Sequence, residues 1–211
     1  MNEKLKFDKK KHVYSVKGRN ILSVTSVLPD IPEHLLYKQS FMDKTLLGIR
    51  VHNCADTINN HYKTHCMEIP CEDVYKSDPF QKEDGPYIKA YLKFLKEKKP
   101  VIIASETKMF HKLFNYAGTV DLVVEIKSKK YIYDIKTTSR VAPYARLQLA
   151  AYVRMWNYEN PDKEIFNRGV IHLKPDGTYT LVPYSVKDLK NDTDIFLCFL
   201  RSKQWMAANG V

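Results

Sequence analysis

The sequence predicts an α/β fold of the α+β kind, in which a central mixed β-sheet is flanked by α-helices. Three observations predict it. The 211 residues are 44% hydrophobic with only 7 glycines, which is enough for one buried core. Helical and strand-like periodicities alternate along the chain, and the predicted order is helices, three strands, helix, two strands, helix. We expect a single domain over residues 1–211 that begins with a hairpin and a helical extension.

The N-terminal half contains the extension and the first helices. Residues 5–18 alternate apolar and polar around a lysine-rich turn, which predicts a hairpin or a pair of short strands. Residues 32–63 carry apolar residues at helical spacing, and Pro32 suits a first helical turn, so we expect one or two helices there. Residues 64–86 have turn formers and no clean period, which predicts an irregular connection. Residues 87–99 form an amphipathic pattern that predicts a helix.

The C-terminal half contains most of the predicted sheet. Residues 101–110 and the hairpin at 118–138 predict three successive strands. Pro143 precedes an apolar-periodic segment at 144–158, which predicts a second strong helix. Residues 168–185 predict another hairpin, turned at the Pro-Asp-Gly of 175–177. Ser185 and Asp188 resemble a capping pair for a final helix at 189–205.

Charge and composition limit the classes of function. The formal net charge of +10 favours a polyanionic partner such as nucleic acid, although a solvated lysine-rich surface is the alternative. The chain lacks the roughly 20 consecutive apolar residues of a membrane span, and its charged start lacks the apolar core of a signal peptide. We therefore expect no membrane partner and a cytoplasmic protein, in the host cytoplasm if it is phage-encoded. The 4 cysteines are expected to be thiols without a disulfide.

Two acidic residues and a lysine in the predicted hairpin at 118–138 are the candidates for chemistry. Strand side chains alternate with period two, so Lys136 shares a face with Asp134. If the loop around 127–130 has an even number of residues, Asp121 lies opposite or diagonal to Asp134 on that face. Directly opposed strand residues have Cβ atoms about 5 Å apart, and at that range two ionised carboxylates repel unless a proton or cation lies between them, so this register predicts a divalent-cation site. An odd loop would separate the carboxylates, and ordinary surface pairs are the alternative.

The chain resembles the PD-(D/E)XK nucleases, and within them the RecB-like branch, in five motifs that follow the expected order. The motif residues are Gly48 and His52 in GIRVH, Glu106 in SETKMF, Gly118 and Asp121 in GTVD, Asp134 and Lys136 in DIK, and Gln148 and Tyr152 in QLAAY. The stretch SVTSVL at 23–28 is similar to that of phage-type exonucleases and of the mitochondrial genome maintenance exonuclease. The resemblance covers residues 12–160 and implies a restriction-endonuclease-like core.

The resemblance also implies a metal site and a catalytic set. The implied metal ligands are His52, Glu106, Asp121, Asp134 and the main-chain carbonyl of Ile135. The implied catalytic residues are Asp121, Asp134, Lys136 and Glu106. Glu106 would bind a second ion or hold a water molecule, and Lys136 would position and help deprotonate the attacking water. Outside this context, a lone histidine such as His52 is more often an ordinary hydrogen-bonded residue.

Three further residues are implied to bind the substrate. Gln148 and Tyr152 are four apart on a predicted helix and share one face, and Thr137 follows the lysine of the DIK motif. For Tyr152, a place in the core is the alternative, because the same helical period buries its neighbours.

The expected cofactor is Mg²⁺ or Mn²⁺, as one or two ions. Some RecB-like nucleases carry an iron-sulfur cluster bound by one cysteine before the nuclease core and three after it. Here only Cys198 follows the core, so no such cluster is expected. A zinc site is a minor alternative, with its ligands drawn from His61, His65, Cys66 and Cys71, because histidines at i and i+4 face one way on a helix.

These features together predict a metal-dependent DNA exonuclease used in DNA recombination, repair or phage DNA processing. The expected partner is single-stranded DNA or the ends of double-stranded DNA. A structure-specific or single-strand endonuclease on the same fold is one alternative. A non-catalytic nucleic-acid clamp is another, and a module that binds lipid or protein through the basic face is a third.

Overall fold

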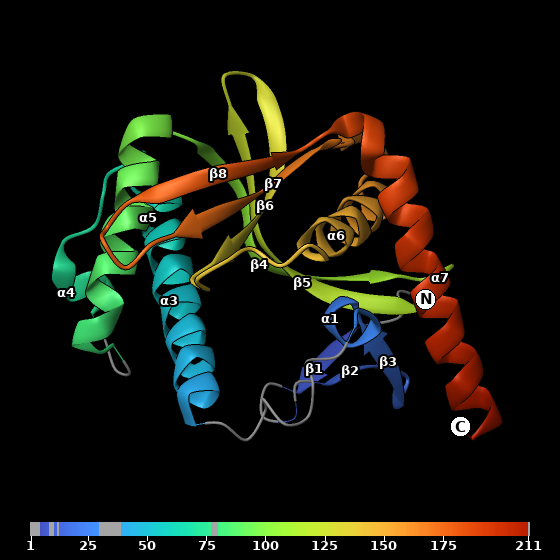
Figure 1. Cartoon of the computed structure of the whole chain (residues 1–211). Coiled ribbons are helices and arrows are strands. Elements are labelled where there is room, and N and C mark those ends of the chain that lie inside the picture. The colour runs from blue at the N-terminus through green and yellow to red at the C-terminus, as the bar shows by residue number, and fades with distance from the viewer. Residues whose placement is uncertain (1–4, 9–10, 12, 30–38, 77–79, 211) are drawn as a thin grey trace.

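The computed structural model describes residues 5–8, 11, 13–29, 39–76 and 80–210. The strands are β1 Lys6–Asp8, β2 Val13–Val16, β3 Arg19–Ser23, β4 Val101–His111, β5 Tyr116–Ile126, β6 Lys129–Lys136, β7 Asn167–Leu173 and β8 Tyr179–Tyr184. The helices are α1 Val24–Val27, α3 Gln39–Thr64, α4 Glu72–Tyr75, α5 Gly85–Lys98, α6 Ala145–Glu159 and α7 Leu189–Asn209 (Figure 1). Short 3-10 turns are η1 Lys82–Asp84, η2 Pro161–Lys163 and η3 Val186–Asp188.

The described strands form one mixed sheet that is organised around β5. The order is β1-β2-β3-β5-β6-β7-β8, and β4 also pairs with β5. Along β5, residues 122–126 pair antiparallel with β6, whereas residues 116–117 pair in parallel with β3. Between these two stretches the neighbour of β5 changes from β3 to β6, so the sheet divides there, and Asp121 lies next to this point. β6 and β7 form the second parallel pair.

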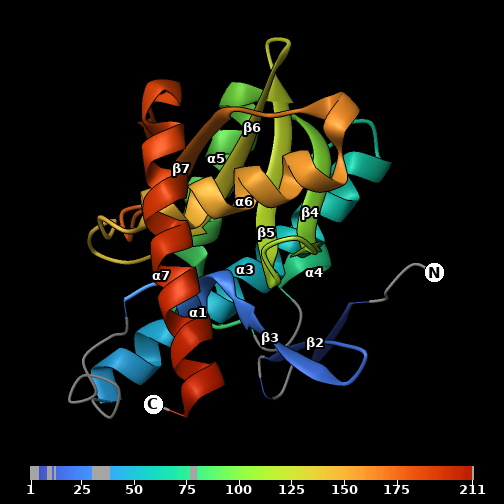
Figure 2. The ribbon, with the colours of Figure 1, turned by 90° about the vertical axis from the view of Figure 1, so that its right-hand side faces the viewer.

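Helices cover both faces of this sheet. On one face, α6 contributes Leu149 and Met155 to a cluster that also contains Ile132 of β6 and Phe196 of α7. Figure 2 shows α6 lying across the sheet with α7 beside it. On the other face, α3 and α5 pack together in a second cluster, where Phe94 is fully buried. The two cores account for the apolar periodicities of these helices.

Most predicted elements are confirmed, with local differences. The N-terminal hairpin is β1 and β2, the helix expected at 87–99 is α5, and the hairpins at 118–138 and 168–185 are present. The expected irregular connection at 64–86 also contains α4 and η1, which are too short to show a period. The parallel strand β3 was not predicted from the sequence. The proposed helix start at Pro32 lies outside the described residues.

The predicted capping pair of the last helix is wrong. The backbone N–H of Lys187 donates to Ser185 Oγ at 3.2 Å, so Ser185 caps the turn η3 rather than α7. Asp188 makes no side-chain cap and instead accepts a hydrogen bond from Arg146 Nη2 at 3.1 Å. The intervening 3-10 turn separates Ser185 from the first turn of α7.

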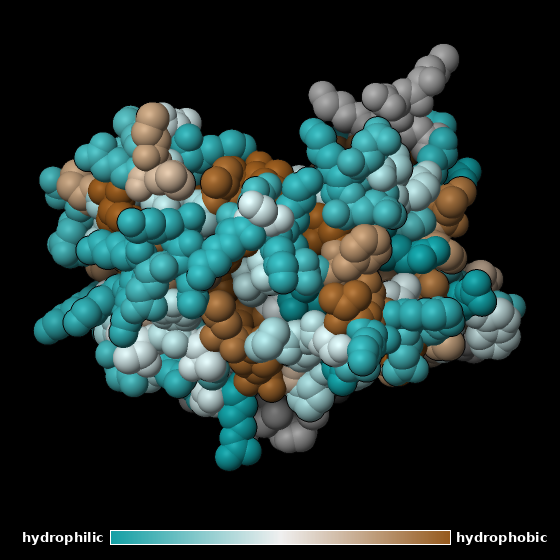
Figure 3. Space-filling view, turned by 90° about the horizontal axis from the view of Figure 1, so that it is seen from above, coloured by the Kyte–Doolittle hydropathy of each residue, from teal (hydrophilic) through white to brown (hydrophobic). Residues whose placement is uncertain are grey.

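The surface agrees with the charged composition. Figure 3 shows one face on which long hydrophilic side chains surround smaller groups of apolar residues. Among the helices in the described part of the chain, none combines the length and the apolarity needed to cross a bilayer.

His111 at the end of β4 gives a testable pH dependence of stability. The ring is 2% exposed and stacks on Tyr116 and Tyr158 with centroids 5.3 and 4.2 Å away. Burial and the cation of Arg154 lower the pKa of His111 to about 4. In the unfolded chain, histidine takes up a proton near pH 6.5. The contribution of neutral His111 to the free energy of unfolding is therefore fully present above pH 6.5, and up to about 3 kcal/mol of it is lost as the pH falls toward 4.

Urea unfolding of wild type and His111→Phe across this range measures the effect. The variant keeps an aromatic ring but cannot titrate, so its free energy of unfolding should fall less between pH 7 and 4.5. Parallel curves for the two proteins would show that His111 does not carry this dependence.

Candidate active site

The turn between β5 and β6 sets the register of the two aspartates. Only Lys127 and Ser128 separate Ile126 from its partner Lys129, and both have left-handed backbone angles, with φ of 49° and 60°. A two-residue turn with positive φ at both positions matches the twist of an antiparallel hairpin. The loop is therefore even, and Asp121 and Asp134 each lie one residue beyond the pair of Leu122 with Tyr133.

The two aspartates have different partners at the point where the sheet divides. Asp121 is 8% exposed, and its Oδ2 accepts a hydrogen bond from Ile135 N at 2.8 Å. Asp134 is 1% exposed, and Lys136 Nζ lies 3.0 and 2.9 Å from its two carboxylate oxygens. Burial raises the pKa of Asp134 to about 6; the Lys136 cation opposes this rise, and the Asp121 carboxylate adds to it. The two carboxylates thus lie within electrostatic reach of each other.

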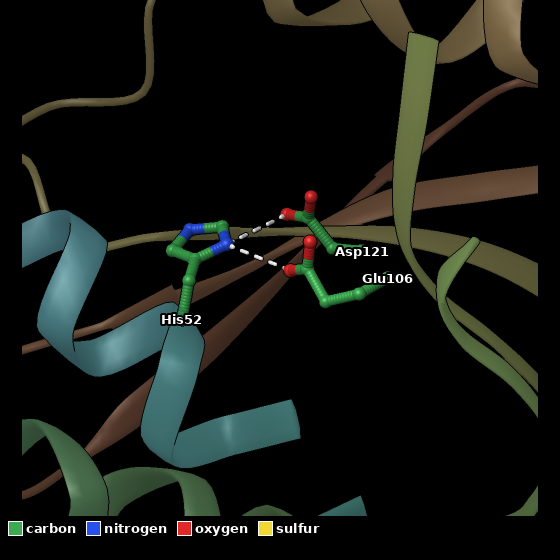
Figure 4. A group of neighbouring side chains, drawn as sticks. All are labelled: His52, Glu106 and Asp121. Carbon is green, nitrogen blue, oxygen red and sulfur yellow. Dashed lines mark ion pairs between the residues drawn. The ribbon is translucent and has the colours of Figure 1, made fainter. Parts of the chain in front are cut away.

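His52 extends from α3 toward both Asp121 and Glu106, as Figure 4 shows. Its Nδ1 lies 3.5 Å from Glu106 Oε1 and 3.6 Å from Asp121 Oδ2. Its Nε2 is 2.9 Å from the carbonyl oxygen of Ile135, which can only accept, so Nε2 carries the proton. Burial alone would lower the pKa of His52, but Asp121 and Glu106 raise it to about 9.

The donor set of this group suits a divalent cation. One ligand atom from each of His52, Glu106 and Asp121 lies within 4.8 Å of the others, and this is the one such group of three among the described residues. Histidine ligands typically donate their second ring N–H to a carbonyl, as His52 does to Ile135. Carboxylate oxygens suit Mg²⁺ and Mn²⁺. The residues therefore fit the predicted ion.

Asp134 and Ile135 are adjacent to this group but are not part of it. Asp134 Oδ2 is buried and, among the described residues, accepts no hydrogen bond of regular geometry despite its nearby Lys136. This leaves it a lone pair that a cation could use. The Ile135 carbonyl already accepts the His52 bond, so its role as a metal ligand stays a prediction.

The predicted substrate residues adjoin the Asp134 side of the site. Gln148 Nε2 donates to Asp134 Oδ1 at 3.0 Å and to Tyr152 Oη at 3.1 Å. Tyr152 is 3% exposed and belongs to the core, which agrees with the alternative that it is a core residue. Thr137 is half-buried after β6 and faces Gly48 of α3. Substrate contact by these three residues stays a prediction.

Glu106 has a feature that its strand pattern did not reveal. Its φ is +45°, in the left-handed region that non-glycine residues rarely occupy. Such a backbone costs on the order of 1–3 kcal/mol and is kept only where neighbouring contacts impose it. Sequence reasoning also missed Asp56 and Asn59, which both hydrogen-bond to the Ser105 hydroxyl beside Glu106. The position of Asp56, four residues after His52 on one helical face, was the available signal.

The alternative zinc site is not assembled. The rings of His61 and His65 stack at 3.9 Å. Within the described ranges, however, these histidines and Cys66 or Cys71 form no group of three potential ligands. The 4 cysteines are free thiols.

Gly118 explains why the GTVD motif begins with glycine. A Cβ at this position would lie 2.9 Å from Tyr152 Cε1, 3.1 Å from Val24 Cγ2 and 3.2 Å from Met155 Cε. Gly118→Ala is therefore expected to displace Tyr152 and lower the free energy of unfolding by about 1–3 kcal/mol. Gly48→Ala is the matched control, because its Cβ would meet only Thr137 Oγ1 at 3.6 Å and alanine favours a helix interior.

Denaturant unfolding of both variants tests this packing. Gly48→Ala should be as stable as wild type or more stable. Equal stability of Gly118→Ala and wild type would contradict the close approach of α6 to β5.

Comparison with known proteins gives the fold. No family model and no curated protein matches the sequence. A solved structure of a "putative exonuclease" from Eubacterium rectale is 12% identical, with a TM-score of 0.50, and the match covers 87% of this chain and 70% of that one. The alkaline exonuclease LHK-Exo from Laribacter hongkongensis is 10% identical, with a TM-score of 0.32 over 76% of this chain and 91% of that chain. A structure of LHK-Exo in complex with dAMP gives a TM-score of 0.33 at 10% identity, over 90% and 93% of the two chains.

The Eubacterium rectale structure shares the fold of this chain. Its similarity covers 87% of this chain. The expected restriction-endonuclease-like fold, a mixed sheet flanked by helices, is therefore confirmed.

Proposed function

We propose that this protein is a metal-dependent deoxyribonuclease that hydrolyses phosphodiester bonds. The observation that carries the proposal is the convergence of His52, Glu106 and Asp121 beside the buried pair of Asp134 and Lys136. Potential metal ligands next to an ammonium are suited to a phosphate substrate. A protein that only binds nucleic acid would not need such a set of metal ligands. The fold shared with the Eubacterium rectale protein supports the same reading.

Each group has a distinct part in this proposal. His52 Nδ1, Glu106 and Asp121, with Asp134 Oδ2, would hold Mg²⁺ or Mn²⁺ as one or two ions. The ion, when bound, supplies Lewis-acid activation of water and stabilises negative charge on the phosphate. Lys136 would position the attacking water, favour its deprotonation through the positive charge of its ammonium, and offset the charge that develops on the phosphate. Gln148 orients Asp134 through its 3.0 Å hydrogen bond.

The finer assignment is an exonuclease acting on single strands or on the ends of duplex DNA, in recombination, repair or phage DNA processing. It follows from the RecB-like motifs, which resemble those of phage-type exonucleases. An exonuclease needs a free end, whereas an endonuclease on the same fold cuts a circle. A closed single-stranded circle therefore separates the two.

The decisive experiment incubates labelled linear single-stranded DNA, linear duplex and circular single-stranded DNA with Mg²⁺, Mn²⁺ or EDTA. Wild type should degrade the linear substrates with metal, spare the circle and be inactive in EDTA. Asp134→Ala should be inactive, whereas Asp162→Ala, an exposed carboxylate on η2, should match wild type. Cutting of the circle would favour the endonuclease, and DNA binding without metal-dependent cleavage would favour a clamp.

A further inference from the structure

A row of polar side chains on α3 faces β4 just before Glu106. His52, Asp56, Asn59 and Lys63 follow the spacing i, i+4, i+7 and i+11, so they lie along one side of the helix. We refer to these four residues as the α3 polar row. At one end, His52 reaches Glu106, and at the other Lys63 Nζ donates to the Ile103 carbonyl at 3.0 Å. Ile103 lies where the pairing of β4 with β5 shifts by one residue.

The middle of the α3 polar row is joined to Ser105. Ser105 Oγ donates to Asp56 Oδ1 at 2.7 Å and accepts from Asn59 Nδ2 at 3.0 Å. Tyr91 of α5 donates to Asn59 Oδ1 at 2.5 Å. Asn59 is 1% exposed and Tyr91 is fully buried, so this end of the chain of hydrogen bonds is fixed within the core. A buried network in which each member has a partner is rigid.

Ser105 immediately precedes the left-handed residue Glu106. Ser105 pairs with Leu122 and Thr107 pairs with Val120, on either side of Glu106. A left-handed non-glycine residue is retained only when its surroundings hold it there. Two hydrogen bonds to the preceding side chain supply such a restraint.

We propose that Asp56, Asn59 and Ser105, backed by Tyr91, are positioning residues that keep Glu106 in its left-handed conformation with its carboxylate directed at His52 and Asp121. The inference rests on the proposed metal-dependent function and goes beyond it, because none of these four residues is one of the proposed metal ligands. Groups that orient the residues of a metal site typically change metal affinity 10-fold to 100-fold when they are removed.

The first test measures Mn²⁺ affinity by calorimetry in the absence of DNA. Ser105→Ala removes both hydrogen bonds and should weaken Mn²⁺ binding by about 10-fold to 100-fold. Ser105→Thr keeps the hydroxyl and should stay within about 3-fold of wild type, as should Thr193→Val, which loses a hydroxyl bonded to Leu189 O at 2.8 Å on α7. Equal affinity of Ser105→Ala and wild type would overturn the proposal.

A second pair of variants separates positioning from charge. Asp56 is half-exposed, so its replacement does not threaten folding. Asp56→Asn keeps an acceptor for Ser105 without the negative charge and should bind Mn²⁺ nearly as wild type does, whereas Asp56→Ala should lose about 10-fold. If both variants lose affinity equally, the carboxylate acts through its charge and the positioning role is wrong.

A double-mutant cycle asks whether the effect passes through Glu106. In a Glu106→Ala background, Ser105→Ala should cause no further loss of Mn²⁺ affinity, because the residue that it positions is already absent. Additive losses would contradict the proposal. If wild type binds no Mn²⁺, both the inference and the proposed function fail; if wild type binds Mn²⁺ and only the Ser105 and Asp56 results fail, the proposed function stands.

Discussion

Lys136→Met is expected to lower the rate of metal-dependent DNA hydrolysis by about 10²-fold to 10⁴-fold, the range typical of losing a group that acts in the transition state. Lys136 places its ammonium within 3.0 Å of both oxygens of Asp134 while its side chain stays 28% exposed, so it faces the site and not only its partner. Methionine keeps much of the side-chain volume but supplies neither a charge nor an N–H donor for the attacking water. The loss should therefore fall on catalysis rather than on packing.

Single-turnover kinetics on linear DNA with saturating Mg²⁺ measure the effect. Lys129→Met, an exposed lysine at the other end of β6, is the matched control and should keep the wild-type rate. Circular dichroism and Mn²⁺ affinity establish that Lys136→Met is folded and still binds metal. A folded, metal-binding Lys136→Met that cleaves DNA at the wild-type rate would remove Lys136 from the mechanism.

Asp192→Ala is expected to lower the free energy of unfolding by about 3–5 kcal/mol, because it leaves a buried cation without a partner. Asp192 is 1% exposed on α7 and forms ion pairs with Arg168 of β7 and, at 2.9 Å, with Arg146 Nε of α6. Arg168 is itself fully buried, and its Nη1 donates to Ser185 O at 3.2 Å. The ion pairs thus join β7 to α6 and α7, the two helices on one face of the sheet.

Guanidinium or urea unfolding tests this expectation. Asp188→Ala removes the other carboxylate that contacts Arg146, but that side chain is 51% exposed, so its loss should cost about 0–1 kcal/mol. The double variant Arg168→Met with Asp192→Leu should recover most of the stability, because a buried ion pair is often no more stable than an apolar pair of similar volume. A small effect of Asp192→Ala would show that Arg168 finds another partner.

Several features of the site could be predicted because they depend on local spacing. Asp134 and Lys136 share a face of β6 by the period of two, and the structure pairs them at 3.0 Å. Gln148 and Tyr152 share a face of α6 by the period of the helix, and they are hydrogen-bonded. The even loop at Lys127 and Ser128 was one of two alternatives, and the sequence could not choose between them because both residues allow several turns.

Other features could not be predicted because they depend on segments far apart in the chain. The 2.9 Å contact of His52 with the Ile135 carbonyl spans 83 positions, and it depends on how α3 packs on the sheet. The left-handed Glu106 is imposed by contacts of β4 with α3 and not by the residue type. The capping role expected for Ser185 failed for a local reason, since a 3-10 turn precedes α7.

By itself, the sequence determined the order of the main helices and strands from residue 87 onward and the positions of the acidic and basic side chains within them, because hydrophobic periodicity and turn residues act over a few positions. The tertiary structure alone decided that β5 exchanges β6 for β3 as its neighbour beside Asp121, and that α3 brings His52 to Glu106 and Asp121 there. Those contacts depend on how distant segments pair and pack, which is decided by many weak interactions across both cores. A short stretch of sequence does not specify these interactions.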